Sequence, residues 1–157
     1  MQPDPRTETL LQVTGLETGY GRVQVLWGVD LNVREHESVV LLGANGAGKT
    51  TLLKALMGLI DAWRGQIDYA GADVTRLRTD HRVRRGIVYM SETSGFPGLT
   101  IEENILIGGQ FLPKSQIQSR VDELYGVFPI LAERRRALAS SLSGGQRKML
   151  GIAKALA

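Results

Sequence analysis

One stretch of the chain, residues 38–60 (SVVLLGANGAGKTTLLKALMGLI), constrains the fold more than any other. Residues 38–43 are nearly all apolar and end at a glycine, a pattern typical of a strand buried on both faces of a parallel sheet. A helix is predicted directly afterwards, because apolar residues recur at three- and four-residue spacing. The succession of strand, glycine-rich loop and helix indicates an α/β fold. The apolar residues expected on the sheet-facing side of the helix are Leu52, Leu53, Leu56, Met57 and Ile60.

The loop between this strand and helix, residues 43–50, matches G-x-x-x-x-G-K-[ST] at every required position. Successive backbone N–H groups that open onto a helix N-terminus offer donors and a favourable dipole to a polyphosphate. Glycine permits positive φ and a close approach of the backbone to the phosphates. Lys49 is predicted to reach the β- and γ-phosphates, and the Thr50 hydroxyl to ligate Mg²⁺. The predicted phosphate-binding residues are Gly43, Asn45, Gly46, Ala47, Gly48, Lys49, Thr50 and, near the α-phosphate, Thr51.

Composition limits the class of protein. A chain of 157 residues with 43% hydrophobic residues is long enough to bury a core. It contains no cysteine, which excludes disulfides, thiolate nucleophiles and zinc–thiolate sites and fits a reducing compartment. No apolar run approaches the roughly 18 residues that a membrane span needs. Residues 1–9 lack the apolar region of a signal peptide, so we expect a flexible N-terminal tail on a soluble protein inside the cell.

The charge pattern argues against a nucleic-acid partner. The net charge of +3 comes from 19 basic and 16 acidic residues, which is a mild excess. Nucleic-acid surfaces often interleave aromatic side chains with basic ones, but aromatic residues make up only 6% of this chain. We therefore interpret the two densest basic runs as solvated faces. These runs are residues 134–136 and the arginines Arg82, Arg84 and Arg85.

The rest of the first hundred residues predicts further strands. Residues 23–33 carry apolar residues at a strict period of two and, with residues 10–16, predict an antiparallel, half-buried pair. Tyr20 lies in the turn between them, either as a surface aromatic or as a flat ring placed to stack on a base. The other expected elements are a strand pair at 66–69 and 72–74, a basic helix at 80–85, a buried strand at 86–90 and a polar loop at 93–98.

From Thr100 onward the apolar period is helical. Thr100 and Glu103 have the spacing of a capping box that opens a helix as far as about residue 111. Residues 115–118 predict a second capping box. We expect a helical insertion because no strand pattern interrupts this region. The apolar face of the helix that follows carries Ile117, Val121, Leu124 and Phe128.

A second glycine-bearing motif, LSGGQRK at 142–148, opens the last predicted helix. A serine and two glycines at a helix start form an anion-binding end, although the same residues also suit a simple well-capped helix. The residues expected along one side of this helix are Met149, Leu150, Ala153 and Leu156.

The two motifs together, GANGAGKTT at 43–51 and LSGGQRK at 142–148, resemble the ATP-binding subunit of ABC transporters. The resemblance covers essentially all of the chain from Leu10 onward. Within the family it is strongest to the ATPases of branched-chain amino-acid importers, on Gly19-Tyr20-Gly21, the strand from Gly86 and the stretch that begins FPGLTIEEN at Phe96. It implies a P-loop NTPase core with an antiparallel β subdomain at 10–99, a helical signature subdomain at 100–145 and a signature helix at 146–157.

The resemblance also implies roles for particular residues. Tyr20 matches the aromatic residue that stacks on adenine, which favours the second interpretation of its ring. Glu92 falls where most members have a glutamine that contacts the metal site, and a carboxylate there can ligate Mg²⁺ but cannot donate as an amide does. Ser143 and Gly145 match residues that contact the γ-phosphate of ATP held by a second subunit. The implied signature residues are Leu142, Ser143, Gly144, Gly145 and Gln146.

The resemblance implies ATP and Mg²⁺ as cofactors. It also implies a second ABC ATPase subunit in a head-to-tail dimer and transmembrane permease subunits, at the cytoplasmic face of the membrane. The family pattern continues with an apolar strand that ends in Asp-Glu and a later histidine, which the sequence lacks. We therefore expect the C-terminal part of the core to be missing and hydrolysis by this chain alone to be lost. Two alternatives stay open: a hydrolysis-deficient nucleotide-binding remnant, and a soluble ABC ATPase that acts outside transport.

Overall fold

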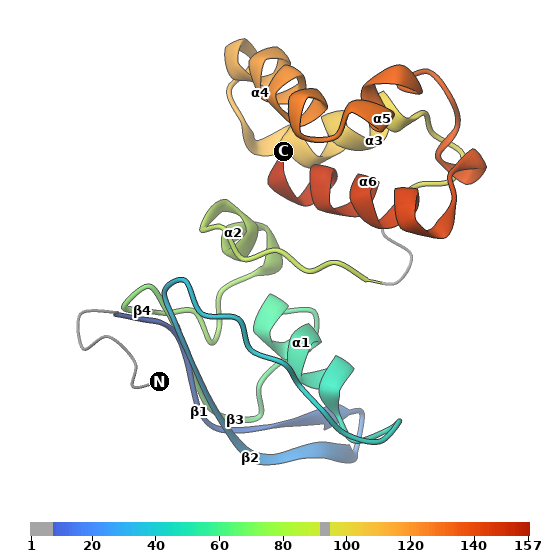
Figure 1. Cartoon of the computed structure of the whole chain (residues 1–157). Helices are drawn as coiled ribbons and strands as arrows, with labels where there is room; N and C mark the ends of the chain where they lie inside the picture. The colour runs from blue at the N-terminus through green and yellow to red at the C-terminus, as the bar shows by residue number, and fades with distance from the viewer. Residues whose placement is uncertain (1–7, 92–94) are drawn as a thin grey trace. The chain divides into compact units, whose positions relative to one another are not determined.

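Residues 9–34 form a long antiparallel hairpin, as their alternating pattern predicts. In the computed structural model, β1 (Thr9–Tyr20) pairs with β2 (Val23–Arg34) and, on its other side, with β3 (Arg64–Tyr69). β3 pairs in turn with β4 (Ala72–Asp73), so the sheet order is β2-β1-β3-β4 (Figure 1). Both predicted strand pairs are confirmed.

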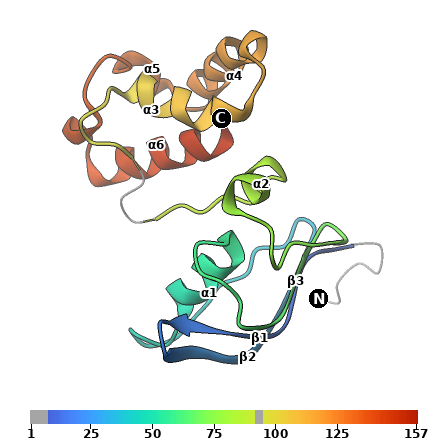
Figure 2. The same cartoon turned by 180° about the vertical axis from the view of Figure 1, so that it is seen from behind.

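The structure describes residues 8–91 and 95–157. The chain divides into two compact units, Met1–Val88 and Tyr89–Ala157. The first unit contains the sheet and the second is helical (Figures 1 and 2). No helix within the described ranges is long and apolar enough to cross a membrane.

The core of the first unit lies between the sheet and the helix α1 (Lys49–Met57) (Figure 1). Leu52, Leu56 and Met57 are buried, as the helical spacing predicts, but Leu53 is 40% exposed because it lies on the far side of the helix. The mixed α/β class that the sequence predicts is confirmed. The buried residues of this core are Val13, Leu16, Leu26, Leu52, Ala55, Leu56, Ala62, Ile67 and Val74.

Two predicted strands are not formed. Residues 38–43 and 86–90 have no regular strand structure, and Val40 and Leu42 are 76% and 89% exposed. A strand needs a neighbour that satisfies its backbone N–H and C=O groups. In the described part of the chain every strand of the sheet is antiparallel, and neither segment pairs with any of them. The apolar runs therefore carry the pattern of buried parallel strands without the partners that would bury them.

The prediction that Arg82 lies on a solvated face is wrong. The basic helix is confirmed as α2 (Thr79–Arg84), but Arg82 is only 2% exposed. Its guanidinium donates to the carbonyl oxygens of Ala55 and Leu56 at 2.9 and 2.7 Å, and it also reaches Leu77 and Thr75. The last carbonyls of a helix lack intrahelical partners and attract cations, so Arg82 caps the C-terminus of α1. Burial lowers the pKa of this guanidinium.

The second unit is built from helices around one apolar cluster. Its α-helices are α3 (Ile101–Gly108), α4 (Lys114–Val127), α5 (Pro129–Glu133) and α6 (Gly144–Leu156), with short 3₁₀ turns η1 (Gly109–Phe111) and η2 (Ala139–Ser141). α3 packs along α6. The buried residues are Ile101, Ile105, Val121, Leu124, Leu131, Ala139, Leu142, Leu150 and Ala153.

The helix ends in this unit confirm one capping prediction and correct another. Thr100 and Glu103 form the predicted capping box at the start of α3. The second box, at 115–118, is absent: α4 begins at Lys114 after Pro113 and has no side-chain cap. Because Pro113 already has the φ that a helix start needs, the helix begins earlier than predicted and Ser115 lies inside its first turn.

The apolar faces of α4 and α6 are partly as predicted. Val121 and Leu124 are buried, and Ile117 and Phe128 pack against the same cluster. On α6 the buried residues are Leu150, Gly151 and Ala153. Met149 and Leu156 are 40% and 49% exposed, because the buried stripe of α6 is narrower than the predicted one.

Candidate nucleotide-binding site

The glycine-rich loop ends at Gly48, which is the N-cap of α1 in the left-handed conformation, with φ of 94°. A Cβ at this position would lie 2.8 Å from the Leu26 side chain of the core. The positive φ therefore requires glycine, and the end of the Leu26 side chain would also have to move to admit a Cβ. Gly46 also has positive φ, of 84°, but no heavy atom lies within 4 Å of the position of its Cβ. Gly46 is thus required only for its backbone conformation.

The first turn of α1 is left open to an anion. No side chain caps the helix and no acidic residue lies in its first turn. The N-terminal N–H groups of a helix have no intrahelical acceptors, and their dipoles favour negative charge. Leu52 and Leu56 pack into the core and thereby fix the orientation of α1. The loop residues that precede the helix, 43–47, are exposed. The arrangement suits a phosphate group.

Lys49 is the first residue of α1, and its side chain reaches back to this loop. Its ammonium group donates to the backbone carbonyl oxygens of Gly43 at 2.7 Å and of Ala44 at 2.8 Å. The loop therefore curls around the side chain of its own lysine, which places a positive charge among the backbone groups that face outward. A bound polyphosphate would offer stronger, charged acceptors to the same ammonium group.

The Thr50 hydroxyl suits a magnesium–nucleotide complex. Within the described ranges, no group of three or more His, Asp or Glu side chains is arranged to hold a metal ion. Mg²⁺ bound to nucleotides takes one or two protein oxygens and completes its shell with phosphates and water. Thr50, in the first turn of α1, presents a hydroxyl of this kind on the exposed surface. Glu92, the other predicted metal ligand, lies outside the described residues.

Tyr20 lies next to the first turn of α1, although it comes from the hairpin. Its hydroxyl is 3.5 Å from the Thr51 hydroxyl oxygen, and the Lys54 ammonium is 5.7 Å from the ring centroid. The contact with Thr51 and the charge of Lys54 lower the pKa of the phenol. The ring is 46% exposed, so one part of it contacts α1 and the rest faces solvent.

The second motif forms the start of α6. Ser143 is the N-cap, and its hydroxyl accepts from the Gln146 N–H at 3.3 Å while the Ser143 N–H donates to the Gln146 Oε1 at 3.0 Å. Leu142 is buried and anchors the turn. Gly144 and Gly145 are exposed, with no heavy atom within 4 Å of a Cβ built on either. The fold of this unit therefore does not require glycine at either position.

Arg134 is a residue near this motif that the sequence patterns missed. Its guanidinium donates to Gln146 Oε1 at 3.2 Å and to the Ser141 hydroxyl at 3.1 Å. Arg134 is half-buried rather than fully solvated, because its side chain contacts Ser141 and Gln146 beside the start of α6. Three consecutive arginines carry no periodic signal that distinguishes the first from the others.

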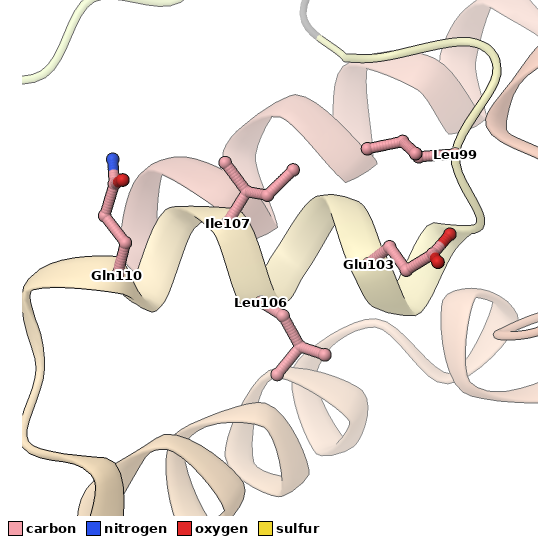
Figure 3. A pocket seen from close by; sticks show the side chains of 5 residues that line it. All are labelled: Leu99, Glu103, Leu106, Ile107 and Gln110. Atoms are coloured by element: carbon pink, nitrogen blue, oxygen red, sulfur yellow. The ribbon is translucent and has the colours of Figure 1, made fainter.

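A shallow hollow of about 470 Å³ lies along α3, lined by Leu99, Glu103, Leu106, Ile107 and Gln110 (Figure 3). Its lining is mostly aliphatic, and its one carboxylate, on Glu103, accepts hydrogen bonds from Thr100. These bonds lower the pKa of Glu103. No predicted phosphate or signature residue lines this hollow, which lacks the cations and N–H donors that a triphosphate needs.

Comparison with known proteins identifies the family. Residues 26–157 match the model of the ABC transporter family, and the chain belongs to that family of ATP-binding proteins. It is 35% identical to the probable branched-chain amino acid transport ATP-binding protein LivF of Archaeoglobus fulgidus, over 94% of this chain and 63% of that protein. It is 39% identical to the corresponding protein BraG of Pseudomonas aeruginosa, over 94% of this chain and 64% of BraG. The chain thus spans less than two thirds of the length of these relatives.

A further relative belongs to the same family, and solved structures share the fold. The lipopolysaccharide export ATP-binding protein LptB of Haemophilus influenzae is 37% identical, over 95% of this chain and 63% of LptB. A solved ATP-binding cassette of an ABC transporter has a TM-score of 0.82 over 95% of this chain and 65% of that chain, at 24% identity, which shows the fold. An ATP-binding subunit of an ABC transporter has a TM-score of 0.74 at 30% identity, over 92% of this chain and 60% of that one.

Proposed function

We propose that this chain is the ATP-binding part of an ABC transporter ATPase and that residues 43–51 hold the triphosphate and its Mg²⁺. The observation that carries this proposal is the first turn of α1, with its glycine N-cap, no side-chain cap, no acidic residue and the Lys49 ammonium within the loop. Lys49 neutralises the β- and γ-phosphates, Thr50 ligates the metal and Thr51 lies near the α-phosphate. Backbone N–H groups from Asn45 to Gly48 complete the cradle.

The adenine base stacks on Tyr20 in this proposal. The half-exposed ring lies beside Thr51, so a base on its free face would be near the phosphates that the first turn of α1 holds. A base stacked on an aromatic ring gains free energy without specific hydrogen bonds. Tyr20 therefore contributes affinity for the nucleoside part of the ligand.

The signature residues act on ATP held by a second chain. Gly144 and Gly145 leave the start of α6 open, and the Ser143 cap holds it in a fixed shape. The capping box occupies the N–H groups of Ser143 and Gln146, and the exposed glycine backbone between them is left to the γ-phosphate of a nucleotide on another subunit. Two chains would then pair head to tail around two nucleotides, with Leu142 and Gln146 as internal supports of the contact.

The names of the relatives support a proposal about the transport role. LivF and BraG are named for branched-chain amino acid transport, whereas LptB is named for lipopolysaccharide export at a similar identity. We propose a branched-chain amino-acid importer, with transmembrane permease subunits as partners at the cytoplasmic face of the membrane. Glu92 stays a proposed metal ligand, on the family resemblance alone. Residues 10–99 form the ATP-binding core and 100–145 the helical subdomain in this assignment.

Nucleotide binding is tested with two variants, each of which lacks one lysine. Lys49→Ala is expected to weaken Mg-ATP binding at least tenfold in calorimetry, because a charge-assisted contact to phosphate is lost. Lys114→Ala removes an exposed lysine of α4 and serves as the matched control. Equal affinities in the two variants would refute the assignment of the loop.

Pairing is tested by adding bulk at two exposed glycines. Gly145→Arg fits within the isolated chain, since nothing lies near its Cβ, but it would block a phosphate from the start of α6. Gly126→Arg places the same side chain on α4, also in open space. In sedimentation velocity with Mg-ATP, only Gly145→Arg should abolish dimers. Dimers that form equally well in both variants would exclude the signature contact.

A further inference from the structure

The guanidinium of Arg134 forms hydrogen bonds at both ends of the signature turn, residues 141–146. Nη1 donates to Gln146 Oε1 at 3.2 Å, and Nη2 donates to the Ser141 hydroxyl at 3.1 Å and to the Ser141 carbonyl at 3.5 Å. Ser141 immediately precedes Leu142, and Gln146 is the last of the five signature residues at 142–146. One planar group thus connects the residue before the exposed turn with the residue at its end.

These bonds determine how the Gln146 amide is oriented. Its Oε1 accepts from the Ser143 N–H at 3.0 Å as well as from Arg134. A flipped amide would point its NH₂ group at two donors, one of them cationic, and lose both bonds. Arg134 therefore favours the orientation that keeps the capping box closed. An Arg guanidinium makes both contacts because its donors diverge in a fixed plane, which a lysine ammonium does not offer.

We propose that Arg134 is a positioning residue for the signature turn: it holds residues 141–146 in the shape that receives the γ-phosphate of a partner chain. The inference rests on the proposed function, in which the signature turn contacts the γ-phosphate of ATP that is bound to a second chain. Arg134 does not itself contact nucleotide. Its contribution is preorganisation, since a turn that is already ordered loses less conformational entropy when the nucleotide binds.

The chain offers a matched control two residues further on. Arg136 is exposed in the same arginine run, so Arg134→Gln and Arg136→Gln remove the same charge from nearly the same place. Arg134→Gln is expected to weaken Mg-ATP-dependent pairing about tenfold, the usual worth of a hydrogen bond to a charged group. Mg-ATP binding to the chain's own loop should equal that of Arg136→Gln, because the loop belongs to the other unit.

A mixing experiment separates positioning from misfolding. A head-to-tail pair of an Arg134→Gln chain and a Lys49→Ala chain contains one unaltered composite site, made from Lys49 of the first and the signature turn of the second. In sedimentation velocity with Mg-ATP, the mixture should pair more strongly than either variant alone. A mixture that pairs no better than its components would overturn the proposal, and so would an Arg134→Gln chain that pairs as well as Arg136→Gln.

Different results would refute the proposed function itself. If the unaltered chain does not pair with Mg-ATP, or if Lys49→Ala pairs equally well, the two-chain ATP site itself is wrong. If the unaltered chain pairs and Lys49→Ala does not, the site stands, and the Arg134 variants alone decide whether this arginine positions the turn.

Discussion

The hydroxyl of Tyr20 lies 3.5 Å from the hydroxyl oxygen of Thr51, which connects the end of β1 to the first turn of α1. The two residues are 31 positions apart, and the sheet brings them together because α1 packs on β1 and β2. The ring that is proposed to stack on the base is thus held beside the residues that are proposed to bind phosphate.

Removing the ring should weaken ATP binding without affecting the phosphate contacts. Tyr20→Ala is expected to lower ATP affinity by about 1–3 kcal/mol, the usual value of one aromatic stack on a base. Tyr20→Phe keeps the ring and loses only a long hydroxyl contact, so its affinity should stay close to that of the unaltered chain. Calorimetry with inorganic tripolyphosphate provides the control, since its affinity should be equal in all three chains. A weaker tripolyphosphate affinity in Tyr20→Ala would show that the loop itself had been disturbed.

Two adjacent glycines at the end of α3 should respond differently to the same change. A Cβ on Gly108 would overlap the carbonyl oxygen of Lys154 and lie 2.9 Å from its carbonyl carbon, whereas the nearest atom to a Cβ on Gly109 is 3.8 Å away. Gly108→Ala must push α3 from α6 and is expected to cost about 1–3 kcal/mol of unfolding free energy. Gly109→Ala should be close to neutral. Urea unfolding of both variants decides the point, and equal midpoints would contradict the close packing of the helices.

Arg82 should matter far more for stability than its exposed neighbour Arg85. Arg82→Met would leave the Leu56 carbonyl without its donor, whereas the Ala55 carbonyl would keep the Gly58 N–H; the expected cost is about 1–3 kcal/mol for the group left unsatisfied. Arg85→Met removes a similar side chain from the exposed end of α2 and should change the unfolding free energy by less than about 0.5 kcal/mol. Comparable losses in the two variants in thermal or urea unfolding would argue against the cap.

Tyr125 holds a buried hydroxyl that has no hydrogen-bond partner among the described residues. Burial, with the nearby charge of Glu102, raises its pKa to about 12. Because the folded pKa is above the ordinary value of 10.0, titration of this group leaves the free energy of unfolding unchanged below pH 10 and lowers it as the pH rises towards about 12. Tyr125→Phe is expected to raise the melting temperature slightly at pH 7 and to remove this alkaline loss. A melting temperature that falls at pH 7 would show that the hydroxyl has a partner.

Local patterns predicted much of the fold because they act within a few residues of chain. The period-two residues of 23–33 formed a strand, and the Thr100–Glu103 spacing formed a capping box, since each depends only on neighbouring backbone groups. The apolar run at 38–43 had the right composition for a buried strand but did not form one. Burial of a strand depends on a partner elsewhere in the chain, which local composition does not specify.

The amino-acid sequence alone determined the family and the two glycine-bearing turns, because their chemistry depends on consecutive residues at helix starts. Only the tertiary structure decided which long-range partners support them. Arg82 and Arg134 belong to similar basic runs, yet one caps the end of α1 and the other connects Ser141 to Gln146. Charge and spacing are alike in a run of arginines, and only the folded chain decides which of them meets an unpaired carbonyl or amide oxygen.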